Sequence, residues 1–316
     1  MMKAKLNIIK GLGILAIVVA AFTSNAQQDP MYTQYMFNTQ TINPAYAGTW
    51  ESVGFMLLGR HQWTGFDGAP ETYSFSFQAP LKNERVALGL NLISDKVQYV
   101  KRLYMYADYS YLVPLSETLN LRLGLKGGFT NYSHNLALHN ILDPGDPSFL
   151  GEIDSKLKPN FGVGAFLYTK RAYLGFSIPR IVNSTFDSDY DNFSVEAQMR
   201  HYFLTAGAVF DLGENVKFKP TALTKASFTS ETGTPVQFDL SGNFLIKEKL
   251  WLGAMWRSGD SYGFIAQFLF AEKLRLGYAI DFSTTNLQNY NNGTHEVMIS
   301  YELKFKKERV VSPRYF

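Results

Sequence analysis

A period-two alternation of apolar and polar residues recurs along this chain. Between residues 119 and 126 leucine occupies every odd position, and the even positions hold Asn, Arg, Gly and Lys. Similar splits recur at residues 273–282 and 296–305. Successive side chains of a β-strand point to opposite faces, so these segments predict strands with one apolar face and one charged or small face. Such strands suit a membrane barrel, where they separate lipid from a wet lumen.

A soluble β-sandwich also produces this alternation, with a protein core on the apolar side. Two features favour the membrane barrel. The segments reach about ten residues, the length of a transmembrane strand. Many carry aromatic residues near their ends, as at a membrane interface, and Phe, Tyr and Trp make up 15% of the chain. We therefore favour a barrel over a sandwich.

Fourteen segments carry the pattern, and an even number of strands allows a sheet to close with both chain ends on one side. The predicted fold is all-β, a transmembrane antiparallel β-barrel of about 14 strands with an irregular periplasmic N-terminal arm. The segments are centred near Phe55, Phe75, Gly89, Tyr106, Leu123, Gly164, Gly175, Gly207, Phe218, Asp239, Gly253, Phe264, Gly277 and Ser300.

The connections between these segments alternate in length. Those after even-numbered segments are tight, as at residues 80–84 and 247–248. Those after odd-numbered segments are generally longer, with residues 133–158 and 180–199 the extremes. Short turns of outer-membrane barrels face the periplasm and long loops face outward. The alternation therefore predicts that both chain ends are periplasmic.

Residues 1–26 have the organisation of a signal peptide. Three lysines precede an apolar stretch at residues 11–22, and a small-residue cleavage pattern follows. The apolar stretch is well short of the ~20 residues that a spanning helix needs. The predicted organisation is a signal peptide at 1–26, an N-terminal arm at 27–50, an outer-membrane β-barrel at 51–306 and a C-terminal periplasmic tail at 307–316. We expect localisation in the outer membrane.

Several function classes are disfavoured by composition. Removal of residues 1–26 lowers the formal net charge from +3 to zero, and no basic stripe remains for nucleic acid. The absence of cysteine excludes disulfides, thiol nucleophiles and Cys-ligated metals. The five histidines include no pair at the spacing of a helical zinc site, and no Gly-x-Ser-x-Gly motif occurs. We expect a non-enzymatic protein without a cofactor or metal site.

The polar face of the predicted strands carries charges of both signs. They could set the ion selectivity of an open pore or pair across a filled lumen, which we favour. A fourteen-stranded barrel has room for water or for a plug, and residues 28–48 are a candidate plug. A folded protein is too wide for this lumen, which favours docking over transport of such cargo. The candidate lumen charges are Asp108, Arg122, Lys126, Lys217, Lys219, Lys225, Asp239, Arg275 and Asp281.

The arm is rich in Tyr, Asn and Pro and too irregular for a strand. Its aromatic side chains offer large rigid contacts with a polar group, and its amides can bond to backbone. One hypothesis is that it binds a periplasmic partner; the alternative is that it closes the barrel floor and packs inside. The candidate residues are Tyr32, Tyr35, Phe37, Asn38, Asn43 and Tyr46.

An ordered series of motifs runs along the whole chain after the signal peptide. It begins with QQDPMYTQYMFN at 27–38 and INPAYAG at 42–48, continues through GRHQW at 59–63 and HYFLTAG at 201–207, and ends with SPRYF at 312–316. Together these motifs resemble the PorP/SprF family of outer-membrane proteins, which is associated with type IX secretion and gliding in Bacteroidetes-type bacteria.

The resemblance implies a non-enzymatic outer-membrane component of a type IX secretion system. Such a component would help the export or surface attachment of specific secreted proteins, including gliding adhesins. The implied partners are outer-membrane lipid, periplasmic and outer-membrane secretion-system proteins, and a specific secreted substrate protein. The alternative function is a general diffusion porin, which steady large channel openings would reveal.

Overall fold

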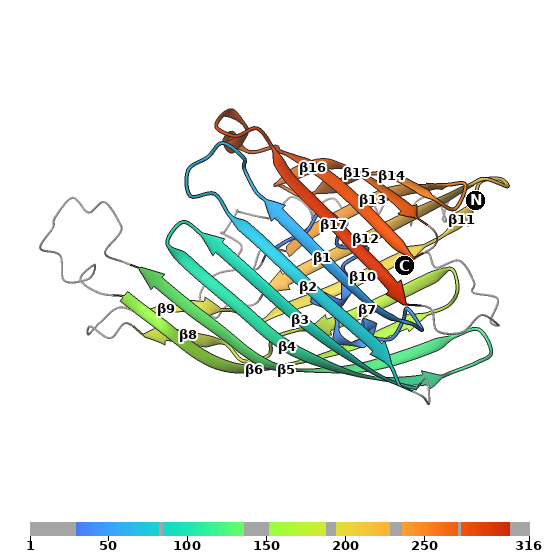
Figure 1. Cartoon of the computed structure of the whole chain (residues 1–316), viewed down its shortest axis with the longest axis horizontal. Coiled ribbons are helices and arrows are strands. Elements are labelled where there is room, and N and C mark those ends of the chain that lie inside the picture. The colour runs from blue at the N-terminus through green and yellow to red at the C-terminus, as the bar shows by residue number, and fades with distance from the viewer. Residues whose placement is uncertain are drawn as a thin grey trace, which may run out of the picture.

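The computed structural model describes residues 30–81, 85–135, 152–187, 194–227, 236–270 and 273–303. Its main sheet is a closed antiparallel barrel (Figure 1). The strands are β1 (Val53–His61), β2 (Glu71–Pro80), β3 (Val86–Val97), β4 (Val100–Pro114), β5 (Asn120–Asn135), β6 (Glu152–Tyr168), β7 (Ala172–Ile178), β8 (Ser184–Asp187), β9 (Ser194–Gln198), β10 (His201–Ala208), β11 (Phe210–Asp211), β12 (Val216–Ser227), β13 (Val236–Ile246), β14 (Leu250–Arg257), β15 (Ser261–Phe270), β16 (Leu274–Ser283) and β17 (Thr294–Leu303).

The wall of the barrel has 14 strands, which confirms the predicted fold. β10 and β11 pair with successive parts of β12 and therefore occupy one position in the wall. β8 and β9 form a separate two-stranded sheet. Each of the fourteen predicted centres falls within a strand of the wall. The sheet closes where β17 pairs with β1, from Val53↔Leu303 to His61↔His295.

The two rims of the barrel differ in their connections. We call the end at which β1 begins and β17 finishes the short-turn rim; it carries the turns at 115–119, 169–171, 212–215 and 247–249. The opposite end, the loop rim, carries longer connections such as 62–70 and 284–293. Two loop-rim connections are nevertheless tight, at residues 98–99 and 258–260. The predicted alternation thus holds in general but not at every hairpin.

Both predicted long loops contain more strand than expected. β5 runs on to Asn135 and β6 starts at Glu152, so both enter the predicted loop 133–158. The predicted loop 180–199 contains the hairpin of β8 and β9. Antiparallel pairing satisfies backbone polar groups beyond the barrel wall, and the sequence pattern had not indicated it. The predicted signal-peptide cleavage site and the tail 307–316 lie outside the described residues.

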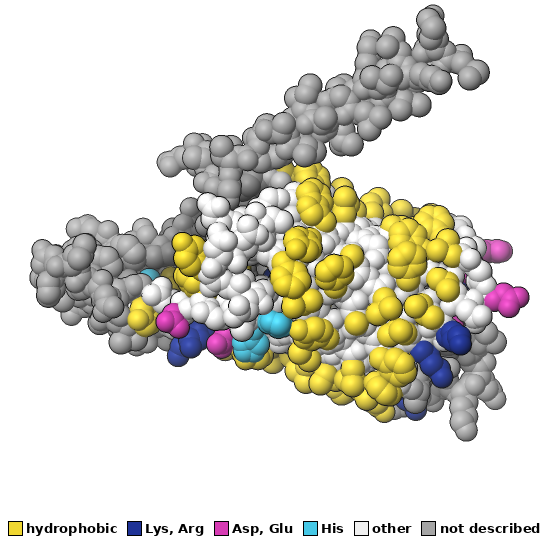
Figure 2. All heavy atoms as spheres, turned by 90° about the horizontal axis from the view of Figure 1, so that it is seen from above, with side chains coloured by type: hydrophobic (Ala, Val, Ile, Leu, Met, Phe, Trp, Pro, Cys, Tyr) yellow, Lys and Arg dark blue, Asp and Glu magenta, His cyan; other side chains and the backbone are white. Residues whose placement is uncertain are grey.

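The direction of the side chains distinguishes a membrane barrel from a soluble sandwich. Leu123 and Leu125 of β5 are 48% and 58% exposed, whereas Arg122 and Lys126 between and beside them are buried. A sandwich would bury the leucines instead. Figure 2 shows hydrophobic side chains spread over much of the outer surface. The apolar face is therefore the outer one, as lipid requires.

The described helical segments are short: η1 (Thr39–Thr41), η2 (Pro44–Tyr46) and η5 (Asn286–Asn289). None of the helices in the described part of the chain is long and apolar enough to cross a membrane.

The described part of the arm, residues 30–50, lies inside the barrel, which corrects the expectation of an arm in the periplasm. Near the start of β1 the ring of Trp50 packs on Gly54. Near the end of β1 the guanidinium of Arg60 donates to the hydroxyl of Thr33 at 2.7 Å. The arm therefore extends along the lumen from the short-turn rim toward the loop rim. The physical reason is that the polar inner wall offers partners to both its backbone and its side chains.

Candidate functional site

Buried polar contacts join the arm to the inner wall at several places along the lumen. The first cluster lies toward the loop rim. Arg60 forms ion pairs with Asp281 at 2.8 Å and with Glu296 at 3.2 Å. Glu296 also accepts hydrogen bonds from the backbone amides of Thr33 and Gln34, each at 2.9 Å. Three wall strands and the arm thus share one charge cluster, in which the carboxylates satisfy the arm's backbone.

A second cluster joins Asp239 of β13 to Arg257 of β14. The guanidinium makes hydrogen bonds of 2.9–3.1 Å to both carboxylate oxygens of Asp239. It also donates to the backbone carbonyl of Tyr32 at 3.1 Å. Close by, the hydroxyl groups of Tyr35 and Thr221 are hydrogen-bonded at 2.9 Å. The planar guanidinium can therefore hold the carboxylate and the arm at the same time.

A third cluster pairs Asp108 of β4 with Lys126 of β5 at 3.3 Å. The side-chain amide of Gln40 donates to Asp108 at 3.2 Å, and the ammonium group of Lys126 donates to the carbonyl of Thr41 at 3.4 Å. Asp108 and Lys126 thus each have an opposite charge and an arm group as partners. This arrangement offsets the desolvation of two buried charges.

Arg122 anchors the arm nearer the short-turn rim. Its guanidinium lies 3.4 Å from the carbonyl oxygen of Ala47 and 3.1 Å from the hydroxyl of Ser110, and it donates to both. The same guanidinium lies 3.4 Å from the hydroxyl of Tyr168. The hydroxyl of Ser110 also donates to the same carbonyl oxygen of Ala47 at 2.5 Å. Two wall residues therefore bind a single carbonyl of the arm.

Phe37 occupies a cationic and aromatic site in the lumen. The ammonium group of Lys219 lies 4.5 Å from its ring centroid, and the guanidinium carbon of Arg275 lies 5.3 Å from it. Trp251 packs against the same ring edge to face, with centroids 5.6 Å apart. The ring supplies cation–π contacts to two positive wall residues.

Local sequence shapes the arm where it meets β5 and β6. Asn43 caps η2 by accepting a hydrogen bond from the amide of Ala45 at 2.9 Å, and Pro44 opens the turn. This use of Asn before Pro is typical of a helical N-terminus. On the wall, a Cβ at Gly124 would lie 2.2 Å from the nitrogen of Ala45, and one at Gly164 would lie 2.2 Å from Asn43 Oδ1. These wall glycines allow the arm's close approach.

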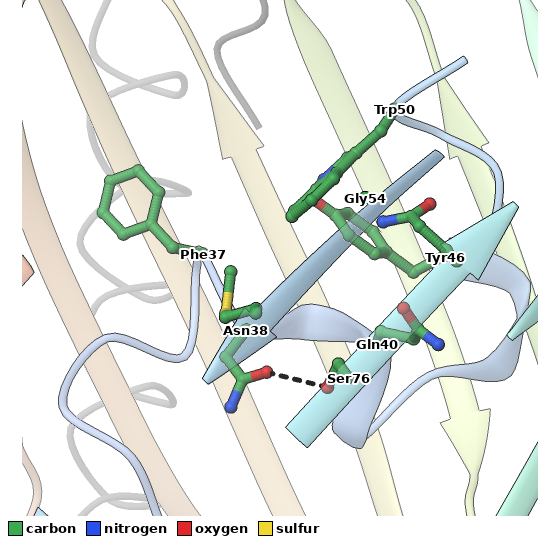
Figure 3. A pocket seen from close by; sticks show the side chains of 9 residues that line it. Phe37, Asn38, Gln40, Tyr46, Trp50, Gly54 and Ser76 are labelled. Carbon is green, nitrogen blue, oxygen red and sulfur yellow. Dashed lines mark hydrogen bonds between the residues drawn. The ribbon is translucent and has the colours of Figure 1, made fainter. Parts of the chain in front are cut away.

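Little space remains between the arm and β1 and β2. Figure 3 shows Phe37, Tyr46 and Trp50 around a residual gap, with Ser76 hydrogen-bonded to Asn38 at 3.5 Å. The gap measures about 10 Å³. A cavity of this size has room for about one water molecule. The lumen is therefore filled at this level.

The structure places the candidate lumen charges where the strand pattern predicted, on the inner side, and brings most of them into contact with the arm. Asp108, Lys126, Asp239 and Asp281 are in ion pairs. Lys225 is buried. Lys217 pairs with Glu248 at the short-turn rim instead of deep in the lumen. Ion pairing in a filled lumen, rather than an open charged pore, is the arrangement observed.

The six arm residues proposed as partner-binding are buried in the lumen. These side chains contact the wall, which favours the alternative hypothesis of packing inside the barrel, and their binding to a partner stays a prediction. Those buried residues are Tyr32, Tyr35, Phe37, Asn38, Asn43 and Tyr46.

Sequence reasoning did not single out Arg60, Arg257 and Glu296, although they hold the arm most directly. The period-two pattern contained the signal for all three. Arg60 and Arg257 alternate with outward residues of β1 and β14, and Glu296 precedes the outward Val297. In the described part of the chain, no group of three or more His, Cys, Asp or Glu could hold a metal ion.

Comparison with known proteins gave structural likenesses and a family. No curated protein matches the sequence. Similar solved structures include the Acinetobacter baumannii outer membrane protein Omp33, with 10% identity over 81% of this chain and 100% of that one and a TM-score of 0.46. A Pseudomonas aeruginosa FadL homologue has 10% identity over 88% and 95% of the two chains and a TM-score of 0.46. The P. putida toluene transporter TodX has 12% identity over 85% and 94% and a TM-score of 0.48.

None of these three likenesses bears on what this chain does, given their identities and TM-scores. The family match is of a different kind, because it covers most of the sequence. The model described as type IX secretion system membrane protein PorP/SprF matches residues 24–301. The resemblance to this family that the motif series indicated is thereby confirmed. The chain belongs to the PorP/SprF family of type IX secretion system membrane proteins.

Proposed function

We propose that this protein is a non-enzymatic outer-membrane component of a type IX secretion system that acts as a docking component and not as a conduit. In this role it helps the export or surface attachment of specific secreted proteins, with gliding adhesins among the candidate substrates. Family membership and the barrel fold support the secretion role and the outer-membrane location. A cleaved signal peptide at residues 1–26 would direct the chain there.

The filled lumen is the observation that carries the docking role. Arg60, Arg122 and Arg257 each bind the arm inside the barrel. A fourteen-stranded wall is in any case too narrow for a folded protein. Secreted cargo and the other secretion-system proteins must then meet this protein on its rims, its loops or its outer face.

Single-channel conductance of the purified, refolded protein tests the docking role against the porin alternative. The wild-type barrel in a planar bilayer is expected to show no steady large openings, because the arm fills the lumen. A general diffusion porin in the same bilayer serves as the control for insertion and detection. Steady openings of porin size in the wild-type protein would contradict the docking role and support diffusion.

The secretion role needs a separate test in the native bacterium. Deletion of the gene is expected to remove a subset of secreted proteins from the cell surface, and the wild-type copy is expected to restore them. An affinity tag on the restored protein should co-purify secretion-system chains from the native membrane. Unchanged secretion in the deletion strain would contradict the proposed role, and loss of all type IX substrates would contradict its specificity.

A further inference from the structure

Five outward-facing residues form one continuous cross-strand row near the loop rim. The register pairs His295 of β17 with His61 of β1, and His61 with Glu71 of β2. It then pairs Glu71 with Lys96 of β3, and Lys96 with Lys101 of β4. Neighbours in such a row lie about 4.5–5.5 Å apart at their Cβ atoms. We call these five residues the loop-rim row.

The loop-rim row follows the end of the apolar outer surface. Toward the middle of the strands, the next outward residues are Tyr73 on β2, Val297 on β17 and Leu103 on β4, which are all exposed. The hydroxyl of Tyr73 is hydrogen-bonded to the ring of His61 at 3.1 Å. Tyrosines at this height are typical of the membrane–water interface. Figure 2 shows histidine side chains at the edge of the hydrophobic surface.

The row is oblique to the membrane because barrel strands are tilted by about 35–45°. Its His295 end lies beside the apolar surface, and its Lys101 end lies farther along the wall toward the loops. Because exposed apolar residues adjoin the row, we expect it to lie near the depth of the lipid headgroups. A groove of about 270 Å³ adjoins it, between the loop at 62–70 and residues His61, Glu71, Lys96 and Gln98.

Lys96 and Lys101 place two positive charges directly opposite each other in this row. Two like charges directly opposite each other in a sheet are destabilising. Both side chains are exposed on the outer face. Among the described ion pairs, none gives either ammonium group a carboxylate within 4.0 Å. An anion bound between them would remove the repulsion.

We propose that the loop-rim row binds the phosphate group of a membrane lipid, with Lys96 and Lys101 as its principal ligands and the groove as the seat of the headgroup. The surrounding bilayer places phosphates at this depth, next to the apolar band that holds the acyl chains. His61 can add a hydrogen bond to the same headgroup. The carboxylates of Asp67 and Glu71 also line the groove, so the phosphate is expected on the side of Lys96 that faces Lys101.

Lipid retention by the detergent-solubilised full-length barrel, measured by native mass spectrometry, tests this proposal. The probe is dioleoyl phosphatidic acid, and dioleoylglycerol is its match with the same chains and no phosphate. Wild-type protein is expected to retain the phosphatidic acid in preference to dioleoylglycerol. The variant K96Q/K101Q should lose about fivefold in affinity per lysine, the contribution of one Lys near an anionic surface. The variant K249Q/K273Q, which changes two exposed lysines near the short-turn rim, should retain the lipid.

Glycerol phosphate without acyl chains separates a lipid site from a site for soluble phosphate. It is expected to compete only weakly, because it cannot use the apolar surface below the row. Competition as strong as that of phosphatidic acid would overturn the assignment to a lipid. Equal retention of dioleoylglycerol, or equal loss of lipid in K249Q/K273Q, would overturn the site itself.

Discussion

Glu296 of β17 accepts a hydrogen bond of 2.9 Å from the backbone amide of Thr33, a residue 263 positions earlier in the chain. Both residues are buried, and the same carboxylate is ion-paired with Arg60. A wall residue thus binds the arm backbone and a second wall strand at once. The carboxylate therefore couples the position of the arm to the seam where the barrel closes.

The variant Glu296→Gln tests this coupling. It keeps the size of the side chain but leaves Arg60 with one carboxylate fewer in a buried site. Removing one partner of a buried ion pair costs about 3–5 kcal/mol. We expect a lower free energy of unfolding in urea with lipid vesicles. The matched control is Glu248→Gln, whose ion pair lies at the rim and contributes about 0–1 kcal/mol. Equal losses in the two variants would contradict the coupling.

The variant Gly124→Ala should displace the arm from the lumen. The new Cβ would meet the backbone of Ala45 at 2.2 Å, and backbone cannot yield as a flexible side chain does. Overpacking of this kind costs about 1–3 kcal/mol. We expect faster proteolysis of the arm and the appearance of channel openings in a planar bilayer.

Gly127→Ala is the control for this variant, because it changes the same strand on its outer side. The Cβ there has a single ordinary contact, with Phe161 at 3.8 Å. Arm protection and conductance should match the wild type. If Gly124→Ala also leaves both unchanged, the close approach of the arm to β5 is wrong.

The lipid-facing surface predicts that the cost of a charged substitution depends on its depth in the membrane. Leu57 lies in the middle of β1 and is 47% exposed, whereas Leu303 ends β17 at the short-turn rim. Arginine at the bilayer midplane costs about 2–4 kcal/mol, and near the interface about 0–1 kcal/mol. Leu57→Arg should therefore reduce the yield of heat-modifiable folded barrel much more than Leu303→Arg. A larger loss at Leu303 would contradict the assigned depth.

The native absence of cysteine gives a clean test of orientation. Asp67→Cys lies in the loop-rim connection 62–70, and Glu214→Cys lies in the short turn 212–215. If short turns face the periplasm, a membrane-impermeant maleimide on intact cells should label only the first variant. Both should react after the outer membrane is opened. Labelling of Glu214→Cys in intact cells, without labelling of Asp67→Cys, would reverse the predicted orientation.

The sequence alone determined the fourteen strands of the barrel wall and the facing of their side chains. The reason is local: the pleat of a strand fixes a period of two, so Leu123 and Arg122 must point to opposite sides of any sheet that contains them. The length of the segments and their aromatic ends favoured lipid over a protein core on the apolar side, and the exposure of Leu123 in the structure confirmed it. The motif series in the arm identified the family for the same reason, because it can be read without knowing any contact.

Only the tertiary structure decided where the arm lies and what the inward charges do. The partners of the arm are far away in sequence, as Tyr32 is from Arg257 and Gln40 is from Asp108. An irregular segment has no period that indicates its neighbours, so its sequence is equally compatible with a periplasmic partner and with the lumen. The closed wall resolves the choice physically. It gathers buried charges from many strands around one space, and the arm supplies the hydrogen bonds that those charges need.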